Sequence, residues 1–112
     1  MKAVFVVFSS PKTPELEAEF EHWYDTEHIP AVLGQDGFVR ATRYRVVDTG
    51  NEPPPELAPY TTLVVYELDS DDPAASLAGL RAVRRTGKIR GSTAGFLSVD
   101  PPALTALYAE AD

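Results

Sequence analysis

The alternation of apolar and polar residues divides the chain into strand-like and irregular stretches. Residues 2–8 are apolar on both alternating faces, which is typical of a strand covered on both sides. Residues 38–47 predict a second strand, and residues 60–68 predict a third that is rich in β-branched and aromatic side chains. Residues 93–99, rich in small side chains, predict a fourth. The proline-rich segment 48–59 predicts a long hairpin loop or a mobile flap between the second and third strands.

Two stretches between these strands have helical periodicity. Thr13 is expected to cap a helix that begins at Pro14 and runs to about His28. The helix is expected to stop there because Pro30 disfavours helical geometry at the residue before it. Asp72 is expected to cap a second helix, which has a narrow apolar face and arginines near its C-terminus.

The order of elements predicts an α+β protein. Strands and helices follow the ferredoxin-like order β-α-β-β-α-β, which forms an antiparallel four-stranded sheet with both helices on one face. A short helix is expected after Pro101 and Pro102, with its apolar side provided by Leu104, Leu107 and Tyr108. Because the strands are apolar on both faces, the second sheet face needs a cover. We expect a second copy of the chain to supply it, giving a homodimer with the architecture of a dimeric α+β barrel.

Composition narrows the class of protein. The 112 residues with 44% hydrophobic content are enough for one domain spanning residues 1–112. The absence of cysteine excludes disulfides, thiolate metal ligands and a cysteine nucleophile. The net charge of -7 argues against a nucleic-acid partner, and no apolar run is long enough to span a membrane. The first eight residues are interpreted as a strand and not a signal peptide, so we expect a cytoplasmic protein. The proline and alanine content suggests a bacterial source.

Side chains able to take part in binding or catalysis are concentrated in residues 20–30, FEHWYDTEHIP, where aromatic, acidic and histidine residues are interleaved. On a regular helix, Trp23 and Glu27 fall on one stripe, and Tyr24 and His28 lie together along its edge. Burying an unpaired carboxylate is costly. Glu27 is therefore expected to have a partner, to reach water at the helix end, or to face a polar cavity.

The run Phe20-x-x-Trp23-Tyr24-x-x-x-His28-x-Pro30, followed by Gly37-Phe38-Val39 and then Tyr44, resembles the EthD-like group of dimeric α+β barrel proteins. The resemblance implies that barrel fold over nearly the whole chain. It also implies that His28 occupies the histidine position of the family and that Trp23 and Tyr24 form its aromatic pair. Relatives include isomerases, cyclases, lyases and monooxygenases, so the family does not fix the reaction.

The residues themselves indicate proton transfer. His28 is the natural general acid or base at neutral pH, and Tyr24 can donate a hydrogen bond from the same edge, so we predict catalytic roles for both. Alternatively, His28 only caps the end of the helix. Arg43 and Arg45 either anchor a carboxylate or enolate or pair with the many acids. Four further side chains are predicted to bind the substrate: Glu27, Arg40, Tyr44 and Tyr66.

No metal site and no cofactor are expected. His22 and His28 lie on different sides of the helix, and the chain contains no glycine-rich phosphate-binding motif. The preferred interpretation is a cofactor-independent enzyme of isomerase, cyclase, lyase or monooxygenase type. It would act on an aromatic or lactone-like metabolite, with His28 as the proton carrier. The alternatives are a non-catalytic binding or accessory protein for a hydrophobic metabolite, and a dimeric domain without a working site.

Overall fold

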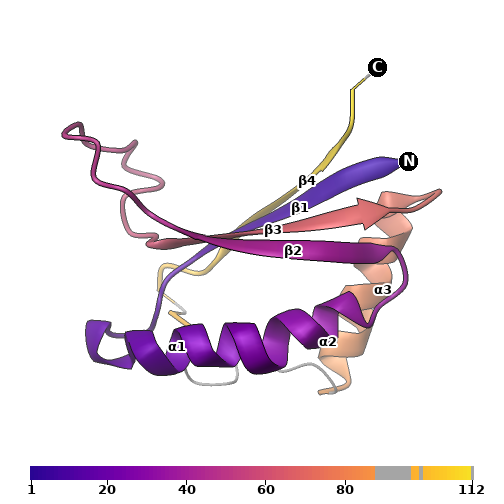
Figure 1. The fold of residues 1–112 in the computed structure, drawn as a ribbon, viewed down its shortest axis with the longest axis horizontal. Helices are drawn as coiled ribbons and strands as arrows, with labels where there is room; N and C mark the ends of the chain where they lie inside the picture. The colour runs from indigo at the N-terminus through magenta and orange to yellow at the C-terminus, as the bar shows by residue number, and fades with distance from the viewer. Residues whose placement is uncertain (88–96, 99, 112) are drawn as a thin grey trace.

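The computed structural model describes residues 1–87, 97–98 and 100–111. Within them, the strands form an antiparallel four-stranded sheet in the order β2-β3-β1-β4, an α+β arrangement compatible with the predicted ferredoxin-like fold. The helices all lie on one side of this sheet (Figure 1). The elements in chain order are β1 (Lys2–Ser9), the 3-10 turn η1 (Pro14–Leu16), α1 (Glu17–Trp23), the π-helical turn η2 (Tyr24–His28), α2 (Ile29–Leu33), β2 (Phe38–Arg45), β3 (Thr62–Asp69), α3 (Pro73–Arg85) and β4 (Leu104–Ala109).

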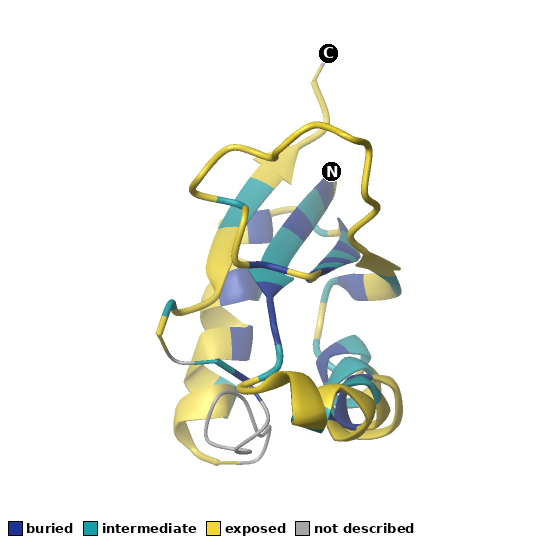
Figure 2. Cartoon of the chain, turned by 90° about the vertical axis from the view of Figure 1, so that its left-hand side faces the viewer, coloured by how far each residue is buried: buried dark blue, intermediate teal, exposed yellow. Residues whose placement is uncertain are grey.

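One face of the sheet packs on the helices to form the core. Phe5 of β1 lies opposite Tyr66 of β3 in the sheet register, and both side chains are buried. Buried and half-buried residues alternate in the first half of β1, from Ala3 to Val6 (Figure 2), as the period of a strand requires. The core cluster contains Ala3, Phe5, Phe20, Trp23, Tyr24, Val32, Phe38, Val64, Tyr66, Leu68, Leu77, Leu80 and Leu97.

The other face of the sheet, here called the open face, carries no helix from the described part of the chain. Val6 and Val65 face each other at its centre and are half-buried. The prediction that β1 and β3 are apolar on both faces is therefore confirmed. Three large side chains of the flanking strands are exposed on the same face: Tyr44, Leu104 and Tyr108.

The C-terminal segment forms a strand, so the predicted short helix at this position is wrong. Leu104 and Tyr108 fall on the open face, whereas Leu107 faces the helices opposite Phe5. The prediction failed because these three residues have the spacing of a helical face. Since both faces of the sheet are apolar, a strand also buries apolar groups at these positions. So short a helix has little stability of its own, whereas the edge of β1 offers a full row of backbone partners. The strand predicted at residues 93–99 lies largely outside the described residues.

The connection between β2 and β3 contains neither helix nor strand, as predicted, and rises on the side of the sheet away from the helices (Figure 1). Its last residues are nevertheless tied to the body of the protein. The Ser10 hydroxyl donates a hydrogen bond of 3.0 Å to the carbonyl of Pro59, and the Tyr60 hydroxyl donates one to the carbonyl of Pro102. The end of the connection is thus part of the folded structure.

We expect Trp23→Ala to lower the free energy of unfolding by about 3–5 kcal/mol, because the indole is fully buried in the core. Urea unfolding measures the loss. His22→Ala, at the exposed neighbouring position, is the control and should be nearly neutral. A loss below about 1 kcal/mol for Trp23→Ala would show that the ring lies outside the core.

Candidate functional site

The helical segment between β1 and β2 continues through Pro30, so the prediction that it ends near His28 is wrong. The backbone N–H of Ile29 donates to the carbonyl of Tyr24, five residues earlier, which is the hydrogen bond of a π-helix. In a regular α-helix, the proline ring would collide with the carbonyl four residues before it. The wider η2 turn relieves that conflict, and Pro30 then occupies the first turn of α2, where proline is tolerated.

The extra residue in this turn changes which side chains meet. A regular α-helix would place Glu27 in line with Trp23, but the π-helical turn brings the His28 ring onto the indole. The two ring centroids lie 4.7 Å apart with an interplanar angle of 23°, which is a stacked arrangement. Glu27 is exposed and lies beside His22 and Trp23 in a shallow hollow on the helix surface. Of the three environments expected for the Glu27 carboxylate, the structure therefore shows exposure to water.

Tyr24 and His28 meet, as their spacing predicted. The Tyr24 ring meets the His28 ring edge-on at a centroid distance of 5.6 Å. Its hydroxyl points toward the sheet and shares a hydrogen bond of 2.9 Å with the hydroxyl of Ser9, at the end of β1. Tyr24 is thus fully buried, whereas His28 is half-buried at the surface of the same aromatic cluster. The two predicted catalytic residues form one continuous group between helix and sheet.

Tyr66 belongs to the same layer. It projects from the helix-facing side of β3 and is buried. Burial raises the pKa of both Tyr66 and Tyr24 above the usual value for tyrosine, and the charge of Arg84 opposes this rise at each of them. Tyr24 also raises the pKa of Tyr66. Both therefore stay protonated at neutral pH and are able to donate a hydrogen bond.

Two arginines of β2 form ion pairs with acidic residues of the helical segment. Of the two roles left open by the sequence, the structure therefore shows pairing with acids of the chain. Arg43 donates from Nε and Nη2 to the two carboxylate oxygens of Asp25, each at 2.9 Å. Arg45 donates in the same way to Glu21, at 2.9 and 2.7 Å. These hydrogen bonds are the main reason that the pKa values of Asp25 and Glu21 are lowered.

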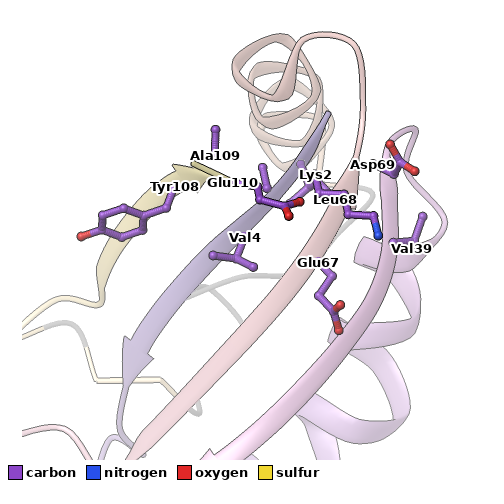
Figure 3. Close-up of a pocket in the computed structure, with 10 residues that line it drawn as sticks. Lys2, Val4, Val39, Glu67, Leu68, Asp69, Tyr108, Ala109 and Glu110 are labelled. Carbon is purple, nitrogen blue, oxygen red and sulfur yellow. The ribbon is translucent and has the colours of Figure 1, made fainter. Parts of the chain in front are cut away.

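The remaining predicted site residues lie elsewhere. Arg40 and Tyr44 are on the open face, where Arg40 Nε lies 3.5 Å from a carboxylate oxygen of Glu67. This face also carries a hollow of about 650 Å³ at the end of the sheet, between Val39 and Tyr108 (Figure 3). Within one chain, the structure therefore brings His28 and Tyr24 into contact and places Tyr66 in the same helix-facing core. It places Arg40 and Tyr44 on the opposite side of the sheet and leaves Glu27 on the outer surface of the helix.

Sequence reasoning missed Ser9 and the specific role of Asp25. Ser9 has a signal in the sequence, because it ends the helix-facing row of β1 with a polar residue that needs a partner once buried. The Asp25 side chain is half exposed, and its contact with Arg43 depends on a strand 18 residues away in sequence, which local periodicity does not show.

Among the described residues, no three histidine, cysteine, aspartate or glutamate side chains gather in a way that would hold a metal ion. In the same part of the chain, no helix has the length and apolar character needed to cross a membrane. No family model matches the chain, and no curated protein matches its sequence.

We expect alkaline pH to destabilise the protein through Tyr24 and Tyr66. Their pKa values are raised in the folded state, so the unfolded chain loses these protons first as the pH rises. Their contribution to the free energy of unfolding is fully present below about pH 10, the ordinary pKa of tyrosine, and is lost as the pH rises further. Ultraviolet absorbance of tyrosinate measures the ionisation. Tyr66→Phe should remove the part of this absorbance that develops well above pH 10 or on unfolding. If the variant instead lacks absorbance that develops near pH 10, the raised pKa of Tyr66 would be contradicted.

Proposed function

We propose that this chain is a cofactor-independent enzyme of isomerase, cyclase, lyase or monooxygenase type that acts on an aromatic or lactone-like metabolite. The observation that carries the proposal is the position of His28, stacked on Trp23 and in edge contact with Tyr24. An imidazole takes up and releases protons near neutral pH. The buried rings of Trp23 and Tyr24 hold this imidazole at the surface of an apolar aromatic cluster.

Each residue of the proposed site has a distinct role. His28 carries the proton, since it is half-buried and reaches the surface of the cluster. Tyr24 is held in one orientation by its hydrogen bond to Ser9 and forms the wall beside the imidazole. Tyr66 lies in the same helix-facing core and remains a neutral hydrogen-bond donor. Arg40 and Tyr44 lie too far around the sheet to join this group within one chain.

We further infer that the chain is a member of the EthD-like proteins. The proposal is supported by the motif of Trp23, Tyr24, His28 and Pro30 together with the observed order of strands and helices. The spacing of the motif also has a physical basis in this chain, because the turn that accommodates Pro30 is the turn that brings His28 to Trp23. The lack of cysteine suits a reducing compartment, and we propose the cytoplasm as the location.

We propose that a second copy of the chain covers the open face, which would complete a dimeric α+β barrel. The support is the row of apolar side chains there, from Val6 and Val65 at the centre to Tyr44, Leu104 and Tyr108 at the edges. Contiguous apolar surface of this kind marks an interaction site. A two-fold dimer buries the same patch of both copies at once.

Sedimentation at micromolar concentration should give about twice the monomer mass. Val65→Asp places a charge at the centre of the open face and should produce monomers or unfolded protein. Ala78→Asp, which adds the same charge on the exposed surface of α3, should leave the dimer intact. A well-folded monomer for the unmodified chain at this concentration would contradict the barrel.

The proposed chemistry is testable without knowledge of the natural substrate. A proton carrier should catalyse exchange of the acidic C–H protons of a panel of benzo-fused lactones and cyclic ketones for deuterium in D₂O, which NMR measures. His28→Gln should lower the exchange rate by roughly 100-fold or more, the usual scale for a general acid or base. His22→Gln, on the exposed side of the same helix, should leave it unchanged.

The outcome also separates the enzyme from its alternative. Binding of a panel compound without exchange, with equal affinity in both histidine variants, would contradict the enzyme proposal. That result would identify a binding or accessory protein for hydrophobic metabolites. Equal exchange rates in the unmodified protein and in His28→Gln would remove His28 from the reaction.

A further inference from the structure

We infer that Arg43 is a positioning residue that holds the η2 turn and thereby keeps His28 against Trp23. The inference rests on the proposed function, because it assigns to Arg43 the support of the group that would move the proton. The effect of Arg43 would pass through Asp25, which lies within the turn immediately after Tyr24.

The contact between Arg43 and Asp25 has the geometry of a rigid clamp. Two parallel hydrogen bonds of 2.9 Å join the planar guanidinium to the planar carboxylate, so the pair fixes orientation as well as distance. Arg43 Nη1 also lies 3.6 Å from a carboxylate oxygen of Glu21, one turn earlier on α1. A single side chain of the sheet therefore spans the junction between the α-helical and the π-helical parts of the segment.

Arg43 and Arg45 form similar pairs but grip different parts of the helix. The Arg45 side chain is 65% exposed and binds Glu21 on α1, ahead of the π-helical turn. The Arg43 side chain is only 16% exposed and binds Asp25 inside that turn. Exposed ion pairs contribute little to stability, whereas a partly buried bidentate pair retains more of its strength. Arg45 is therefore a natural control for Arg43.

The turn needs a support of this kind. Pro30 prevents a regular α-helix but does not by itself select the π-helical turn, because a kink or a break would also relieve its clash. A clamp from β2 onto Asp25 favours the arrangement in which the carboxylate faces the sheet edge. In that arrangement Tyr24 points to Ser9 and His28 stacks on Trp23. The charge of Arg43 also favours the ionised form of Asp25, which keeps the clamp closed at neutral pH.

NMR of the His28 ring tests this role directly. Protons stacked over an indole are shifted upfield, so the His28 ring signals report its contact with Trp23. Arg43→Ala should lose this shift, and Asp25→Asn should lose it too, since either change removes the charged clamp. Arg43→Lys keeps the positive charge but lacks the planar guanidinium that donates two parallel hydrogen bonds, so it should recover only part of the shift. Arg45→Ala, the control, should retain it.

Retention of the upfield shift in folded Arg43→Ala or Asp25→Asn would overturn the inference. If Arg43→Ala fails to fold, Asp25→Asn decides the question, because it keeps the shape of the side chain. A merely structural role predicts equal effects from the Arg43 and Arg45 variants on the His28 signals, which would also overturn it. The readout needs no substrate, so the positioning role and the proposed enzyme activity fail or stand independently.

Discussion

The ring of Pro30 is the constraint on which the rest of this geometry depends. It has no N–H to offer the carbonyl of Thr26 and leaves no room for a regular α-helical turn there. The chain responds with a π-helical turn, in which Ile29 bonds back to Tyr24, and the helix then continues. The additional residue rotates His28 onto the indole of Trp23. A backbone requirement thus brings a titratable side chain into an aromatic cluster.

Two strands of the sheet contact this helical segment. Ser9 at the end of β1 provides the hydrogen-bonding partner for the Tyr24 hydroxyl, and Arg43 of β2 reaches across to the turn itself. The proposed site therefore lies on the helix side of the sheet, whereas the surface proposed for self-association lies on the open face. On these two proposals, each face of the same strands would have its own use, and both faces of β1 and β3 would need to be apolar.

Local patterns in the sequence predicted much of the fold but less of the site. The first three strands follow from stretches of apolar, β-branched and aromatic residues. The cap of α3 is confirmed, because the Asp72 carboxylate accepts a hydrogen bond from the N–H of Ala75. The C-terminal strand was missed because an apolar surface on both faces imitates helical spacing. The π-helical turn was missed because a period of 3.6 residues was assumed throughout. Arg43 was weighed as a partner of acids, but its choice of Asp25 is a tertiary contact.

The central claim is that Pro30 is accommodated by a π-helical turn that places His28 on Trp23. Scalar coupling through hydrogen bonds, measured by NMR on the isotopically labelled protein, identifies which carbonyl each amide binds. The account predicts coupling between the amide nitrogen of Ile29 and the carbonyl carbon of Tyr24. Coupling from Ile29 to the carbonyl of Asp25 would show a regular α-helical turn, and the account of this site would then be wrong.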